Sequence, residues 1–136
     1  MIRCCATLLL LVLLTGCTTN LMRPPRDEWP EIGNEFAKSL RWSGPDLAAT
    51  FFSNEDRPAF LAAYGQDIGL QVTNIDHHAV GPLVGIKAQG LLVMEYYRSP
   101  SVSVKKANIP LEWSCLEVGP LLPCRWQITT QFSRLP

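Results

Sequence analysis

The sequence contains few of the residues that carry catalytic or metal chemistry. Its two histidines, His77 and His78, are adjacent, and no helical HExxH spacing accompanies them. It has no glycine-rich phosphate loop and no nucleophile elbow. Lys105-Lys106 is the only run of basic residues, so the charge pattern gives no indication of nucleic acid binding. These absences exclude the function classes that such motifs mark, and we expect no catalytic residue, metal or cofactor.

Long hydrophobic runs are also missing. The longest, Ala6–Leu14, is far shorter than the roughly 20 residues that a membrane-spanning helix needs. A single basic residue, Arg3, precedes this run, as in export signals. The run ends in Leu14-Thr15-Gly16-Cys17, which resembles the lipobox of bacterial lipoproteins. In that motif small residues before the cysteine admit the peptidase, and the thiol takes a diacylglyceryl group.

The resemblance implies that residues 1–16 are a cleaved signal peptide and that Cys17 becomes a lipid-bearing N-terminus, with acyl chains such as palmitate. At about 0.8 kcal/mol per buried methylene, such chains hold a protein permanently at a membrane. Thr18 stands where an inner-membrane retention signal would have aspartate, so we expect the periplasmic face of the outer membrane. Residues 17–28 contain Pro24-Pro25 and are typical of an extended stalk. The alternative is an ordinary secretory signal with an incidental cysteine.

The mature chain is expected to form one nearly neutral domain. Removal of the signal takes away one basic residue, Arg3, of the twelve, and none of the twelve acidic residues. Residues 29–136 suffice for one modest hydrophobic core and are too few for two.

Cysteine usage predicts a disulfide. Cys4 and Cys5 leave with the signal and Cys17 is acylated, so Cys115 and Cys124 remain as a pair. In an oxidising compartment such a pair is expected to be bridged. A metal site would need further ligands nearby, and a redox pair would more usually show Cys-x-x-Cys spacing.

Helices are predicted for the first half of this domain. Ile32, Phe36 and Leu40 recur at every fourth position, which indicates a helix that begins near Trp29. Ser43-Gly44-Pro45-Asp46 ends this helix and begins another, because Pro45 suits a first helical position. The second helix covers residues 47–52. The third runs from the capping segment Asn54-Glu55-Asp56 to about Tyr64.

Strands are predicted for the second half, where hydrophobic residues alternate with polar ones. We therefore expect an α+β domain in which N-terminal helices pack on a curved four-stranded antiparallel sheet. The predicted strands cover residues 70–75, 83–98, 102–115 and 124–132.

The last hairpin has a register that the cysteines specify. If Cys115 lies opposite Cys124, then Trp113 lies opposite Trp126, Leu111 opposite Ile128 and Ile109 opposite Thr130. All of these side chains then share one face, and a one-residue slip would put the tryptophans out of phase.

The element order of residues 30–135 resembles the cone-shaped fold shared by nuclear transport factors and ketosteroid isomerases. A cystatin-like arrangement of a helix on a sheet fits nearly as well. Both folds host unrelated functions, so the resemblance says little about activity.

Two short segments could carry chemistry. In Asp76-His77-His78, expected in a loop, the carboxylate could orient an imidazole and the rings could bind a metal, but neighbours on a strand would point to opposite faces. Glu95-Tyr96-Tyr97 resembles the acid and tyrosine of cone-fold enzymes, but strand alternation separates Tyr96 from its neighbours. We read these groups as loop or surface residues, so alanine at Asp76, His77, His78 or Glu95 should leave function near normal.

The sequence thus predicts a non-enzymatic envelope lipoprotein, a binding or assembly module whose partners are membrane lipid, through acylated Cys17, and an envelope protein. Nucleic acid is not expected as a partner. The alternative is a small-molecule-binding protein or hydrolytic enzyme that uses the cone as a pocket, with Asp76, His77 and Glu95 as its candidate groups. A filled interior with an exposed apolar patch would favour assembly. The tryptophans are expected to pack in the core or at the base of the stalk: Trp29, Trp42, Trp113 and Trp126.

Overall fold

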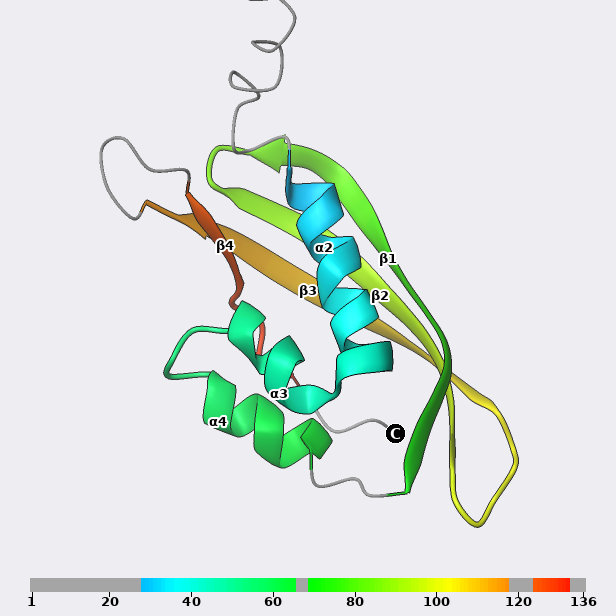
Figure 1. Cartoon of the computed structure of the whole chain (residues 1–136). Coiled ribbons are helices and arrows are strands. Elements are labelled where there is room, and N and C mark those ends of the chain that lie inside the picture. Colours follow the sequence, from blue (N-terminus) through cyan, green and yellow to red (C-terminus); the bar gives the residue numbers. More distant parts are fainter. Residues whose placement is uncertain (1–27, 66–68, 118–123, 133–136) are drawn as a thin grey trace, which may run out of the picture.

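The computed structural model describes residues 28–65, 69–117 and 124–132. The proposed signal peptide, Cys17 and the stalk up to residue 27 lie outside the described residues. Helices come first and a four-stranded antiparallel sheet follows, which confirms the predicted α+β class. Figure 1 shows the helices gathered on one face of a strongly curved sheet. In the described ranges, no helix combines the length and the apolar character needed to cross a membrane.

The helical half consists of one longer helix and several short turns. Helix α2 spans Trp29–Lys38 and continues into η1, Ser39–Ser43. Gly44 then adopts a φ of 86°, which L side chains rarely adopt, and so lets the chain turn sharply before Pro45. The remaining helical elements are α3 (Pro45–Ala48), η2 (Ala49–Phe51), α4 (Arg57–Phe60) and η3 (Leu61–Gly65).

The sheet is a simple meander in which each strand pairs with the next one along the chain. Its order is β1-β2-β3-β4, so β1 and β4 form the two edges. The register of β1 on β2 shifts twice, between Val72 and Asn74 and between Val80 and Val84. The strands are β1 (Leu70–Val84), β2 (Lys87–Arg98), β3 (Lys105–Leu116) and β4 (Arg125–Ile128).

Strand β1 is much longer than predicted. We expected it to end at Ile75 and expected Leu83 to begin the second strand, but β1 runs on to Val84 and the turn lies at Gly85-Ile86. Alternation persists through the segment read as a loop, because Ile75 and His77 are buried while their neighbours are exposed. Because His77 and His78 are both polar, the sequence of this segment does not show the alternation of buried and exposed residues.

The predicted register of the last hairpin is wrong by two residues. Trp113 pairs with Ile128 and Cys115 pairs with Trp126. The expected disulfide joins Cys115 to Cys124 across Cα atoms 5.5 Å apart, but Cys124 precedes β4 and is not directly opposite its partner. A two-residue shift keeps every side chain on its predicted face, because side chains alternate with a period of two.

Aromatic rings fill the space between the helices and the sheet. Phe36 of α2 contacts the rings of Phe52, Phe60 and Trp113, with centroids 5.9 to 6.5 Å apart. Phe52 stacks on Phe60 at 4.5 Å. The largest fully buried side chains, which include these rings, are Trp113, Tyr96, Phe36, Phe52, Phe60, Leu92, Met94, Leu111 and Ile128.

Candidate functional site

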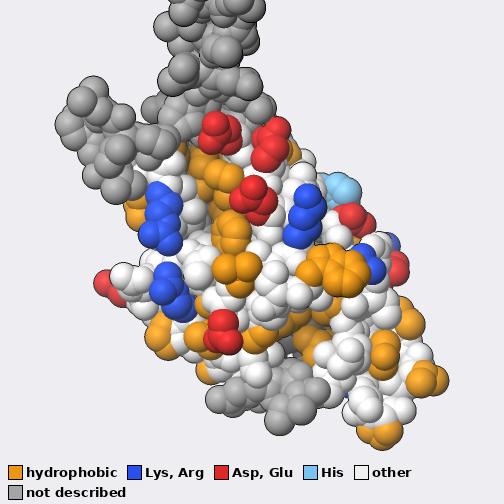
Figure 2. Space-filling model, in the orientation of Figure 1, with side chains coloured by type: hydrophobic (Ala, Val, Ile, Leu, Met, Phe, Trp, Pro, Cys, Tyr) orange, Lys and Arg blue, Asp and Glu red, His pale blue; other side chains and the backbone are white. Residues whose placement is uncertain are grey.

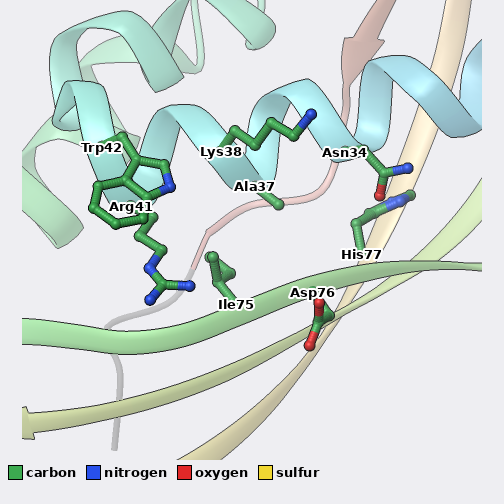
Figure 3. Close-up of a pocket in the computed structure, with 8 residues that line it drawn as sticks. All are labelled: Asn34, Ala37, Lys38, Arg41, Trp42, Ile75, Asp76 and His77. Atoms are coloured by element: carbon green, nitrogen blue, oxygen red, sulfur yellow. The ribbon is translucent and has the colours of Figure 1, made fainter.

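Asp76 and His77 are neighbours on β1, and their side chains lie on opposite faces of the sheet. Figure 3 shows His77 directed toward α2 and Asp76 directed away from it. The Asp76 carboxylate accepts a hydrogen bond from Asn74 Nδ2 at 3.3 Å. His78 is exposed like Asp76. Asp76 therefore does not orient the His77 imidazole.

His77 is a buried group, and the prediction that it lies in a loop or at the surface is wrong. Its side chain is 8% exposed. Its ring meets those of Trp29 and Trp113 edge-on, with centroids 5.6 and 5.8 Å away. A Cβ atom at Gly33 of α2 or at Gly90 of β2 would overlap the imidazole, so both glycines leave the space that His77 occupies.

Burial keeps the His77 ring neutral. It lowers the pKa of His77 from 6.5 to about 4, and the charge of neighbouring His78 adds to the effect. Among the described residues, the buried Nε2 atom has no hydrogen-bond partner. A neutral imidazole between two indoles acts mainly as a packing group, and its low pKa makes it a weak base at neutral pH. No three His, Cys, Asp or Glu side chains within the described ranges could together hold a metal ion.

Glu95 lies on the outer face of the sheet, away from the helices. Its carboxylate is 3.9 Å from Lys106 Nζ, and the two residues are directly opposite across β2 and β3. Tyr96, the next residue, lies on the other face, as the alternation predicted, and it is fully buried. The structure therefore does not bring Asp76, His77 and Glu95 together into one site.

A cleft of about 310 Å³ lies between the α2–η1 helix and β1, beside His77 (Figure 3). Trp42 is 74% exposed at this cleft, and the Arg41 guanidinium lies 4.6 Å from the centre of its ring. The lining residues are Asn34, Ala37, Lys38, Arg41 and Trp42 from the helix and Ile75, Asp76 and His77 from the strand.

The exposure of Trp42 was not predicted. Trp29, Trp113 and Trp126 are buried as expected, whereas Trp42 is not packed in the core. The sequence did carry a signal for this, because the stripe of Ile32, Phe36 and Leu40 places position 42 on a different side of the helix. Figure 2 shows that hydrophobic side chains on this face of the molecule lie among charged ones of both signs.

No protein-family model, curated protein or solved structure matches this chain. The chemistry of the cleft is therefore the guide to what it binds. Lys38 and Arg41 supply two positive charges against the one negative charge of Asp76, Asn34 supplies an amide, and Trp42 and Ile75 supply apolar surface. Such a combination suits a partner segment that presents both an apolar and an acidic side chain.

Proposed function

We propose that this protein is an envelope lipoprotein, held by acylated Cys17 at the periplasmic face of the outer membrane, whose domain is a non-enzymatic binding module for an envelope protein. The anchor rests on the sequence, in which Leu14-Thr15-Gly16-Cys17 directly follows an apolar run. The binding role rests on one observation, which is the exposure of Trp42 at the α2–β1 cleft under the Arg41 guanidinium.

A protein partner fits this cleft better than a small molecule does. Trp and Arg are the side chains most often found at the energetic centre of protein interfaces. The volume of about 310 Å³ is at the lower end for a small-molecule pocket. It is enough for a few side chains of a docked segment, and Lys38 and Arg41 favour a segment with a carboxylate.

The enzymatic alternative has less support in the described residues. The space between the helices and the sheet, where a substrate pocket would lie, contains the rings of Phe36, Phe52 and Trp113. The candidate acids Asp76 and Glu95 lie on the outer face of the sheet. The Asp76 side chain points away from α2 and accepts a hydrogen bond from Asn74 on the same face, and Glu95 is the residue directly opposite Asn74 on β2.

Site-specific photo-crosslinking in cells that carry the protein tests the binding role. A photoreactive residue at position 42 should give one discrete adduct with another envelope protein. The matched control is position 102 in the β2–β3 connection, because Val102 is also highly exposed but lies away from the cleft. The same adducts from both positions, or no adduct from position 42, would contradict the proposal.

A further inference from the structure

The β1–β2 turn carries a group of exposed apolar side chains. Val80, Leu83, Val84 and Ile86 are all exposed, and residues 79–86 contain no charge. Leu116 of β3 is exposed beside them, because the Cys115 amide donates a hydrogen bond to the Ile86 carbonyl at 2.8 Å. We call these five residues the apolar tip. Scattered surface hydrophobics need no explanation, but an uncharged group of this kind indicates an interaction site.

The apolar tip lies at the end of the domain where α2 begins. The ring of Trp29, the first residue of α2, contacts His77, which precedes Val80 by three positions. The other end of α2 lies beside Ile75, because Lys38 and Arg41 share a cleft with that residue. Helix and strand therefore run in opposite directions, and Figure 1 shows the start of α2 next to the β1–β2 turn.

The chain that leads to Cys17 joins the domain at this same end. Glu28 is eleven residues beyond Cys17, so a fully extended connection spans at most about 40 Å. An acylated Cys17 would keep the start of α2, beside the apolar tip, within that distance of the bilayer surface. Lys87, which follows Ile86, places a positive charge beside the tip, where it could pair with lipid phosphates.

We propose that the apolar tip enters the headgroup boundary of the bilayer that holds Cys17, as a second, reversible membrane contact. This inference rests on the proposed acyl anchor. The transfer of Val80, Leu83, Val84 and Ile86 from water to the bilayer interface is favourable, because each brings several methyl or methylene groups out of water. The contact fixes the orientation of the domain. The α2–β1 cleft that contains Trp42, which we call the Trp42 cleft, lies toward the other end of α2 and therefore faces away from the lipid.

Spin labelling of the full-length protein tests this contact. The protein is expressed with Val84→Cys, purified from membranes in detergent and reconstituted into vesicles of phosphatidylethanolamine and phosphatidylglycerol. The matched control is Val104→Cys, because Val84 and Val104 are 70% and 60% exposed and the strand pairing puts them at opposite ends of the sheet. With Cys17 acylated and the Cys115–Cys124 bridge intact, the introduced thiol takes the label.

Accessibility to oxygen and to a water-soluble nickel chelate is measured by power saturation. In vesicles the label at position 84 should gain oxygen collisions and lose nickel collisions, and the label at position 104 should keep its detergent values. Equal nickel accessibility at both positions would overturn the proposal. So would shielding of position 84 with spin–spin broadening, which would show that a second copy covers the tip.

The mass of the N-terminal peptide distinguishes failure of the acyl anchor from failure of the membrane contact. An acylated Cys17 with position 84 in water would refute the membrane contact and leave the anchor intact. An unmodified Cys17 would refute the anchor, and the membrane contact would be refuted with it.

Discussion

The imidazole of His77 lies between two glycines, Gly33 on α2 and Gly90 on β2, and between the indoles of Trp29 and Trp113. The flat, neutral imidazole ring thus fills the space that is free because both glycines lack a side chain. This contact sets how closely α2 approaches the sheet, because neither glycine position accepts even a methyl group while the ring is present.

The contact predicts an unusual effect of alanine at position 33. Alanine normally stabilises a helix interior by about 0.5–1 kcal/mol relative to glycine. Here the new methyl would overlap the His77 ring, so Gly33→Ala should destabilise the fold by about 1–3 kcal/mol. In a His77→Ala background the overlap is absent and the same change should stabilise. Denaturant unfolding of the four proteins in this double-mutant cycle measures the reversal, and additive effects would contradict it.

The neutrality of His77 predicts a loss of stability in mild acid. The folded protein has a His77 pKa of about 4, lowered from 6.5, so the unfolded chain binds the proton more readily below neutrality. Stability should therefore fall as the pH drops from 6.5 toward 4, and the loss between pH 7 and pH 5 should be about 2 kcal/mol. His77→Gln should abolish this part of the slope, and His78→Gln should retain most of it, because burial is the larger cause of the low pKa. Equal slopes for the two variants in urea titrations would contradict the assignment.

At the scale of elements, the pattern of faces could be predicted and the pairing partners could not. Alternation placed Tyr96 and Glu95 on opposite faces of the sheet, and the order of helices and strands followed from their periods. The same period of two cannot distinguish a strand pair from one shifted by two residues, so the pairing of Trp113 was misassigned.

The remaining errors in the predicted site have two causes, and the first is the burial of a polar residue, His77. A buried histidine gives the same local signal as a loop histidine, and only the partners in space, Trp29 and Trp113, separate the two cases. Strand β1 was therefore ended too early, at Ile75. The cleft was missed because its two walls come from Asn34–Trp42 and Ile75–His77, which are far apart in the sequence.

The bridge between Cys115 and Cys124 should contribute measurably to stability. The two residues are nine positions apart, and closing a loop of this size contributes about 2–3 kcal/mol by restricting the unfolded chain. Reduction should lower the melting temperature by roughly 10 °C without abolishing the fold. The Cys115→Ser, Cys124→Ser double variant should match the reduced protein. Non-reducing peptide mapping checks the bridge directly, and two free thiols in periplasmic material would refute it.

The two ends of α2 lie beside two different surfaces of the molecule, one apolar and one that combines apolar and charged residues. The apolar tip lies where the helix begins, and the Trp42 cleft lies toward its other end. A domain tethered through the chain before α2 would therefore present the cleft away from its point of attachment.

The anchor makes a direct prediction. Cys17→Ser should prevent incorporation of a labelled fatty acid and should leave the protein either uncleaved or released into the soluble fraction, because the proposed attachment point is the thiol of Cys17. Metabolic labelling followed by fractionation measures both effects. A Cys17→Ser protein that still incorporates label and sediments with membranes would show that the lipoprotein assignment is wrong.

Trp42→Ala should separate binding from stability. An exposed side chain contributes little to the fold, so unfolding should change by no more than about 0.5 kcal/mol. If Trp42 is at the centre of an interface, affinity for the crosslinked partner should fall by more than about tenfold. Leu47→Ala, at another exposed apolar residue, is the matched control. Equal affinities for the two variants in a binding titration would place the interface elsewhere.

The edges of the sheet determine how copies of the domain would meet if the proposed acyl anchor concentrated them on a membrane. Strand β1 is long and exposed at one edge, but its register shifts near Val72 and again near Val80. Strand β4, at the other edge, is only four residues long, and Ile128 already forms a parallel bridge with Phe52. Within the described residues, the longest stretch of β1 with an unbroken register is Asn74–Val80. These interruptions limit the length of any strand that a neighbouring copy could add at either edge, which disfavours edge-to-edge aggregation.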